Sequence, residues 1–288
     1  MMAVVSVIPT GVMEHRALGR ALAAVFPEHD FITHPPERHA DGFTSRDVAS
    51  LAMAQPGRLP TSLDELAAEL VNAIFPGRRG QKVDFAYVVE DLELCNQHQS
   101  GLVLGLFRDA VDRYIRLTWP QQSDRISAQV RERCSFHLFC PMTEAYFFGD
   151  PVALTRGGAS RPPQLPADVA LEDFRTIDRE FLALPAGTKD IADLPAREFH
   201  PKCYLRYLCD PTLEDTRRRY RETHQGVAAL ATLDWSVVLA TPSHCPFLHA
   251  FLDDLGAALD SPLPFVSPGH ADARVRFPGP KNRILRNL

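Results

Sequence analysis

Four short apolar runs alternate with longer amphipathic segments in the first half of the chain. The runs are rich in Val, Ile and Phe and have the length of buried strands. They cover residues 3–8, 30–33, 83–89 and 135–139. The segments between them place apolar residues at helical spacing and predict helices at 12–26, 62–75, 101–117, 125–133 and 141–148. This alternation predicts an α/β fold with a mostly parallel sheet.

Two parts of the chain depart from this alternation. Residues 34–60 are rich in Pro, Gly and His and have weak periodicity, which predicts an irregular or partly helical segment. After Asp150, short helical pieces lead to two longer predicted helices at 213–233 and 245–259, and we expect this second part to pack on the first as a cap. The expected units are an α/β core at 1–150 with an insertion at 34–80, and a mainly helical cap with a basic tail at 151–288.

Composition and charge restrict the class of protein. Hydrophobic residues make up 45% and charged residues 23% of the chain, which is ordinary for a soluble globular protein. A net charge of −5 argues against a protein that coats nucleic acid by bulk charge, although it is compatible with a local basic path. With no apolar run of membrane-spanning length and no signal-peptide pattern, we expect a cytoplasmic location and no membrane partner.

Three carboxylates follow the apolar run at 83–89, at Glu90, Asp91 and Glu93. Catalytic and binding groups of open α/β sheets lie outside the carboxyl ends of the strands, and hard divalent cations prefer carboxylate oxygens. Asp91 and Glu93 are two residues apart, so in an extended segment they share one side and could chelate one ion. The alternative is a solvated edge where the strand meets a loop.

Three more residues are expected at the same edge of the sheet. Glu14 lies in the first turn after the first predicted strand, and Glu144 follows the last one. Either could instead be an acid in the first turn of a helix, stabilised by the helix dipole. Lys202 precedes a predicted helix and could neutralise a phosphoryl transition state, or it could be a surface lysine.

Other candidate chemistry is weaker. Cys134, His137 and Cys140 are zinc-binding residue types, but strand residues three apart point to opposite faces, so we expect buried thiols instead. No G-x-S-x-G and no phosphate-binding loop is present, which argues against nucleotide hydrolysis. Basic residues that could follow a phosphate backbone, or form a solvated face, are Arg217, Arg218 and Arg219 and, in the tail, Arg283.

Several motifs together resemble a known family. They are C-P-M-T-E-A-Y-F-F-G-D-P, F-H-P-K-C-Y-L-R-Y-L and Y-R-E-T-H-Q-G-V-A-A-L-A-T-L-D-W, together with the acidic pair at the end of the strand. They look like the bacterial family labelled domain of unknown function 4276, which is similar to the Toprim fold of nucleases of the overcoming-lysogenization-defect type. The resemblance covers most of residues 1–255, without 34–80.

The resemblance implies a four-stranded, Rossmann-like Toprim core that carries Mg²⁺ or Mn²⁺. Asp91-Leu92-Glu93 matches the family's Asp-x-Asp motif with Glu at its last position, while Glu144 and Lys202 match a later glutamate and the Pro-Lys lysine. The first motif departs from the pattern Glu-Gly-x-Thr-Glu. Its second glutamate falls on Glu14, whereas its first falls near Pro9 and Thr10.

The leading hypothesis is a metal-dependent nuclease of a bacterial defence system that acts on DNA in preference to RNA. Asp91 and Glu93 would hold the metal, Glu14 and Glu144 would complete one or two metal sites, and Lys202 would offset developing charge. Related systems imply a separate ABC-type ATPase partner. The alternatives are a catalytically weakened Toprim-derived subunit that binds a partner ATPase or nucleic acid, and a phosphatase-like enzyme on a small substrate.

Overall fold

A four-stranded sheet lies at the centre of the protein. The computed structural model describes residues 2–53, 60–76, 81–167, 169–215, 217–240, 245–261, 263 and 285–286. The strands are β1 (Val4–Pro9), β2 (Asp30–Thr33), β3 (Phe85–Asp91) and β4 (Cys134–Phe139). They lie in the order β2-β1-β3-β4, and all their pairings are parallel. The predicted α/β fold with a four-stranded, Rossmann-like parallel sheet is confirmed.

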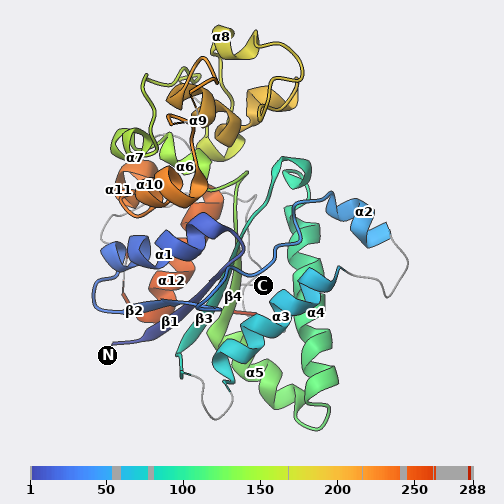
Figure 1. The fold of residues 1–288 in the computed structure, drawn as a ribbon. Coiled ribbons are helices and arrows are strands. Elements are labelled where there is room, and N and C mark those ends of the chain that lie inside the picture. Colours follow the sequence, from blue (N-terminus) through green and yellow to red (C-terminus); the bar gives the residue numbers. More distant parts are fainter. Residues whose placement is uncertain are drawn as a thin grey trace.

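Helices cover both faces of the sheet (Figure 1). On one face lie α1 (Val12–Val25) and α12 (Pro246–Leu259). On the other lie α3 (Thr61–Ile74), α4 (Ser100–Thr118) and α5 (Ser123–Arg133). Side chains of β3 alternate between the two hydrophobic cores, as the strand period of two requires.

The segment at 34–80 contributes to this core. It contains the short helix α2 (Val48–Met53) and the longer α3, whose apolar stripe packs against α4, β1 and β3. Leu63, Leu66 and Leu70 are fully buried there. Irregular structure lies in the described residues before α2, and α3 itself belongs to one layer of the sandwich.

Short helices after β4 build most of the cap. They are α6 (Glu144–Phe147), α7 (Pro151–Arg156), α8 (Arg179–Leu182), α9 (Pro201–Cys209), α10 (Val227–Leu230) and α11 (Trp235–Ala240). Figure 1 shows α6, α8 and α9 beyond the carboxyl end of β4. In the described part of the chain, no helix is long and apolar enough to cross a membrane.

The helix predicted at 213–233 is wrong. Among the described residues of that range, the helical structure is a π-helical turn (Glu222–Gly226) followed directly by α10, so the first half of the predicted helix is not formed. The Asp210 carboxylate accepts hydrogen bonds from the backbone N–H groups of Thr212 and Asp215, at 3.2 and 2.7 Å, which closes a turn at the start of the segment. Local bonds of this kind compete with a helix, and the positive φ of 57° at Leu213 also departs from helical geometry.

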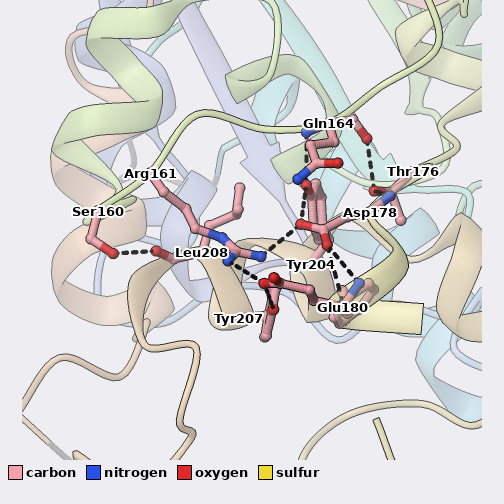
Figure 2. A network of polar contacts seen from close by, with 10 residues as sticks. Ser160, Arg161, Gln164, Thr176, Asp178, Glu180, Tyr204, Tyr207 and Leu208 are labelled. Carbon is pink, nitrogen blue, oxygen red and sulfur yellow. Dashed lines mark hydrogen bonds and ion pairs between the residues drawn. The ribbon is translucent and has the colours of Figure 1, made fainter. Parts of the chain in front are cut away.

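A buried aspartate holds the cap together (Figure 2). The Asp178 carboxylate lies 2.7 Å from the Arg161 guanidinium and accepts a hydrogen bond of 3.0 Å from the Tyr204 hydroxyl. Its other oxygen accepts the backbone N–H groups of Glu180 and Phe181 and so caps α8. Three segments of the cap are therefore tied together at one buried charge.

The carboxyl-terminal end lies at the start of β4. Leu285 is fully buried, and the Arg286 backbone N–H donates to the Cys134 carbonyl at 2.7 Å. The Arg286 guanidinium also pairs with Asp254 at 2.8 Å. These contacts lie at the amino end of the strand, away from the edge where the catalytic residues were predicted. Arg283 lies outside the described residues.

A candidate carboxylate active site

The loop after β1 and the end of β3 lie side by side. Pro9 pairs with Val89, and the Thr10 N–H donates to the Val89 carbonyl at 3.1 Å. The strand β3 continues two residues beyond its predicted end, so Glu90 and Asp91 belong to the strand and do not follow it. This register brings the first turn of α1 to the acidic end of β3.

All the residues predicted to be catalytic line one pocket at this edge. The pocket has a volume of about 190 Å³. Its charged lining residues are Glu14, Glu90, Asp91, Glu93, Glu144, Lys202 and Glu222. Segments that lie far apart in the sequence supply them, namely the first turn of α1, the end of β3, α6, the first turn of α9 and the π-helical turn. The sheet edge therefore gathers carboxylates around one lysine.

Glu14 is 5% exposed, and its Oε1 has no hydrogen-bond partner. A side chain at Gly11 would overlap Glu14 Oε2, so glycine at this position allows the carboxylate to fold back over the helix start. Burial raises the pKa of Glu14 to about 7, and the Glu144 charge adds to the increase, while a hydrogen bond with Thr143 opposes it. Glu14 can therefore exchange a proton near neutral pH.

Asp91 is held by the loop after β4. Its Oδ1 accepts the Thr143 backbone N–H at 2.9 Å and lies 3.1 Å from the Thr143 hydroxyl. Burial raises the pKa of Asp91 well above its ordinary value, and the neighbouring charges of Glu14 and Glu93 raise it further. Thr143 thus contacts both Asp91 and Glu14, and it fixes the two carboxyl groups relative to each other.

Glu93 reaches the pocket through an unusual backbone conformation. Its φ is 64° and its ψ is 154°, a combination that is rare for residues other than glycine and costs about 1–3 kcal/mol. The Glu93 N–H donates to the Pro141 carbonyl at 2.7 Å, which holds the turn against the end of β4. The prediction was that Asp91 and Glu93 share one side of an extended segment. The strand instead ends at Asp91, and the turn at Glu93 brings the second carboxylate into the pocket.

Lys202 lies in the first turn of α9, between two carboxylates. Its Nζ is 2.6 Å from Glu222 Oε1 and 4.0 Å from Glu144 Oε1. Burial alone would lower the pKa of Lys202, but these neighbours raise it above its ordinary value, so the side chain is an ammonium ion at neutral pH. His200 caps the helix with its imidazole, and Pro201 occupies the first helical position. The His-Pro-Lys sequence thus places the lysine at the helix start.

Glu90 anchors a loop over the pocket. Its Oε1 accepts the backbone N–H groups of Phe43 and Thr44, at 2.6 and 2.9 Å. Its Oε2 is buried without a partner, and burial raises the pKa of this carboxyl to about 7. A Cβ at Gly42 would lie 2.7 Å from Glu90 Oε1, so this loop approaches the sheet edge closely. Glu90 therefore positions the loop and also leaves one oxygen in the pocket.

Glu222 and Tyr220 also belong to the site, although they were not predicted from the sequence. The Tyr220 hydroxyl donates to Glu144 Oε1 at 3.1 Å, and the Glu222 carboxylate pairs with Lys202. Both belong to the Y-R-E-T-H-Q-G motif, which carried the family resemblance but had no assigned role. That motif was the one signal available for them in the sequence.

The predicted nucleic-acid residues lie elsewhere. Arg217 is exposed, Arg218 pairs with Asp215 at 3.5 Å, and Arg219 pairs with Asp190. These arginines occupy turns and do not line the carboxylate pocket. Their role in binding nucleic acid stays a prediction.

The donor chemistry of the pocket suits a hard divalent cation. Carboxylate oxygens are the ligands that Mg²⁺ and Mn²⁺ prefer, and the buried, unpartnered oxygens of Glu14 and Glu90 lack the hydrogen bonds that buried oxygens ordinarily have. The side chains do not form a finished cage, because within the described ranges no three Asp, Glu, His or Cys side chains come close enough together to hold a metal ion.

The sulfur-containing residues follow the expected pattern. Cys134 and Cys140 are buried free thiols, and burial raises the pKa of both. His137 lies between them on β4 but pairs with Asp254 at 3.0 Å, on the face covered by α12. These residues contribute to the core.

Comparison with protein-family models, with curated proteins and with solved structures gives no match. The family resemblance therefore stays a prediction, and the function has to be argued from the pocket.

Proposed function

We propose that this protein is a metal-dependent nuclease that hydrolyses the phosphodiester bonds of nucleic acid. The main support is the convergence of Glu14, Asp91, Glu93 and Glu144 on one pocket with Lys202 at the carboxyl edge of a parallel sheet. The unpartnered Oε1 of Glu14 is a second, independent support, because a buried oxygen without a hydrogen bond is costly unless a ligand uses it.

Each side chain has a role in this proposal. Glu14, Asp91, Glu93 and Glu144 would hold Mg²⁺ or Mn²⁺. The bound ion would polarise the phosphoryl oxygen and lower the pKa of water. Lys202 faces the pocket as an ammonium ion and would stabilise the negative charge that develops on the phosphate. Thr143 and the turn at Glu93 would keep the carboxylates in place.

Plasmid nicking with Mg²⁺ or Mn²⁺ tests this function. Asp91→Ala/Glu93→Ala should abolish cleavage that the wild-type protein performs. The control is Asp109→Ala/Asp112→Ala, which removes two carboxyl groups from α4, outside the pocket. Unchanged cleavage by the pocket double mutant would sink the proposal. Hydrolysis of small phosphoesters without any cleavage of DNA would instead favour a phosphatase.

A second candidate is a catalytically weakened subunit that binds a partner ATPase or nucleic acid. Two observations favour this candidate. Pro9 and Thr10 stand where the family motif has its first glutamate. In the described residues, the carboxylates are not arranged as a preformed set of metal ligands. Thermal melting with millimolar Mg²⁺ or Mn²⁺ separates the two candidates. A metal-binding enzyme should melt at a higher temperature with metal, whereas the weakened subunit should not respond.

The proposed cellular setting depends on the family resemblance alone. It comprises a bacterial defence system, an ABC-type ATPase partner, and DNA in preference to RNA. Parallel cleavage assays with DNA and RNA of the same sequence, with and without a co-purified ATPase, test these points.

A further inference from the structure

A segment from late in the chain contributes Glu222 to the lining of the carboxylate pocket. We call Tyr220–Gly226 the wall segment; it packs against the first turns of α1. The Arg16 guanidinium donates to the Thr223 carbonyl at 3.4 Å. A Cβ at Gly226 would lie 2.6 Å from Met13 Sδ, so only glycine allows the two elements to pack this closely. Its Glu222–Gly226 part is π-helical, a conformation that is frequent at functional sites.

The wall segment presents Glu222 to Lys202. The 2.6 Å distance between Glu222 Oε1 and Lys202 Nζ is much shorter than the 4.0 Å from that nitrogen to Glu144 Oε1. The side chains of Glu222 and Lys202 are 33% and 26% exposed, whereas that of Glu144 is 2% exposed. The ion pair therefore lies at the mouth of the pocket, and Glu144 lies deeper.

We propose that Glu222 is a positioning residue that holds the Lys202 ammonium at the mouth of the pocket until a phosphate oxygen of the nucleic acid takes its place. This inference rests on the proposed nuclease function. An ammonium ion has a single positive charge, and here it already faces two carboxylates. A phosphate must therefore compete with Glu222 for Lys202, and Glu222 also repels it.

This competition predicts that the protein binds DNA more tightly when the negative charge of Glu222 is removed. Glu222→Gln keeps the shape of the side chain and removes its charge. We expect it to bind a short labelled DNA duplex about two- to fivefold more tightly than the wild-type protein, since a partly exposed ion pair contributes up to about 1 kcal/mol. Binding is measured by fluorescence anisotropy with Ca²⁺ in place of Mg²⁺. Glu222→Asp, which keeps the charge but shortens the side chain, should give an intermediate affinity.

A matched control removes the general effect of charge. Glu198→Gln removes a carboxylate that pairs with Arg175 at 2.5 Å and is 23% exposed, outside the pocket. It changes the net charge by the same amount as Glu222→Gln, so an equal gain of DNA affinity in both variants overturns the proposal. Thermal melting of each variant verifies that it folds.

A double-mutant cycle tests whether Glu222 acts through Lys202. In the Lys202→Gln background, Glu222→Gln should raise the DNA affinity by clearly less than in the wild-type background, because only the direct repulsion between Glu222 and the phosphate is then relieved. An effect of equal size in both backgrounds overturns the proposal. The proposal also fails if Glu222→Gln raises the Mg²⁺ concentration needed for half-maximal cleavage without changing DNA affinity, because Glu222 is then a metal ligand.

The cleavage assay separates this inference from the function on which it rests. Absence of metal-dependent cleavage by the wild-type protein removes the proposed function. If the wild-type protein cleaves DNA but the wild type and Glu222→Gln bind DNA with equal affinity, only the proposed role of Glu222 is contradicted.

Discussion

Buried carboxylates occur in two different settings in this molecule. In the cap, both oxygens of Asp178 accept hydrogen bonds or ion pairs (Figure 2). Glu172, also buried, accepts the Tyr146 hydroxyl and the Leu248 N–H on one oxygen and the Phe247 N–H on the other. Both oxygens of each of these two side chains therefore have partners within the protein, and these interactions stabilise the fold.

The pocket at the sheet edge is different. Glu14 and Glu90 are also buried, with 5% and 2% of each residue exposed, yet each has one oxygen without a partner. Natural proteins satisfy almost all buried polar atoms, so an unsatisfied carboxylate oxygen needs a separate explanation. The contrast separates carboxylates that stabilise the fold from carboxylates that are available to a ligand. The variants below test this separation, from the largest expected effect to the smallest.

Asp91→Asn should have the largest effect, on activity and not on folding. We expect metal-dependent cleavage to fall by about 10³-fold, as when a main electrostatic group of an active site is lost. The melting temperature should stay the same or rise, because burial and the neighbouring carboxylates, which raise the pKa of Asp91, disfavour a negative charge at this position and a neutral amide avoids it. Plasmid nicking and thermal melting measure the two effects. A marked loss of stability would place Asp91 with the structural carboxylates.

Asp178→Ala should show the opposite behaviour. The change removes the partner of Arg161, the cap of α8 and the acceptor of the Tyr204 hydroxyl. We expect a loss of about 3 kcal/mol in the free energy of unfolding, at the low end for a broken buried pair because Arg161 is partly exposed. Urea unfolding measures this loss. If Asp178→Ala kept its full stability but lost cleavage, the division into carboxylates that stabilise the fold and carboxylates that bind a ligand would be contradicted.

Gly11→Ala should disturb the proposed metal site without unfolding the chain. The added methyl group would overlap Glu14 Oε2 and force that carboxylate to move. We expect the Mg²⁺ concentration for half-maximal cleavage to rise by about tenfold, as when a group that orients metal ligands is lost. Gly101→Ala on α4 is the control, because its methyl group meets no atom within 4 Å. An unchanged Mg²⁺ requirement in Gly11→Ala would remove Glu14 from the ligand set.

Glu172 should make the stability depend on pH. Burial raises its pKa to about 8, so the folded protein binds this proton more tightly than the unfolded chain does. The stabilisation is present below the ordinary glutamate pKa and is lost as the pH rises through about 8.

Glu172→Gln should remove this slope. We expect the variant to lose about 1–2 kcal/mol at pH 5, because an amide nitrogen cannot accept the Phe247 N–H, and to lose less additional stability than the wild type between pH 5 and 8. Urea unfolding at several pH values measures both effects. Identical slopes in the two proteins would contradict the role given to Glu172.

The sequence by itself determined the sheet, the helices that cover it and most of the site. Apolar periodicity reports which side of an element is buried, so the four strands and the long helices could be predicted from local pattern. Parallel strands bring their carboxyl ends to one edge, and this rule alone predicted that Glu14, Asp91, Glu93 and Glu144 would meet.

Only the tertiary structure decided what surrounds those carboxylates. The first half of the helix predicted at 213–233 is replaced by turns because Asp210 bonds to nearby backbone, and the helical pattern of apolar residues does not reveal such local competition. The contact between Glu222 and Lys202 depends on how the cap packs over the sheet edge, and it joins residues whose sequence spacing has no relation to their distance. The local sequence pattern therefore places the acidic residues at the edge of the sheet. The packing of distant segments decides which carboxylates lie near the Lys202 ammonium and which keep one oxygen without a hydrogen bond.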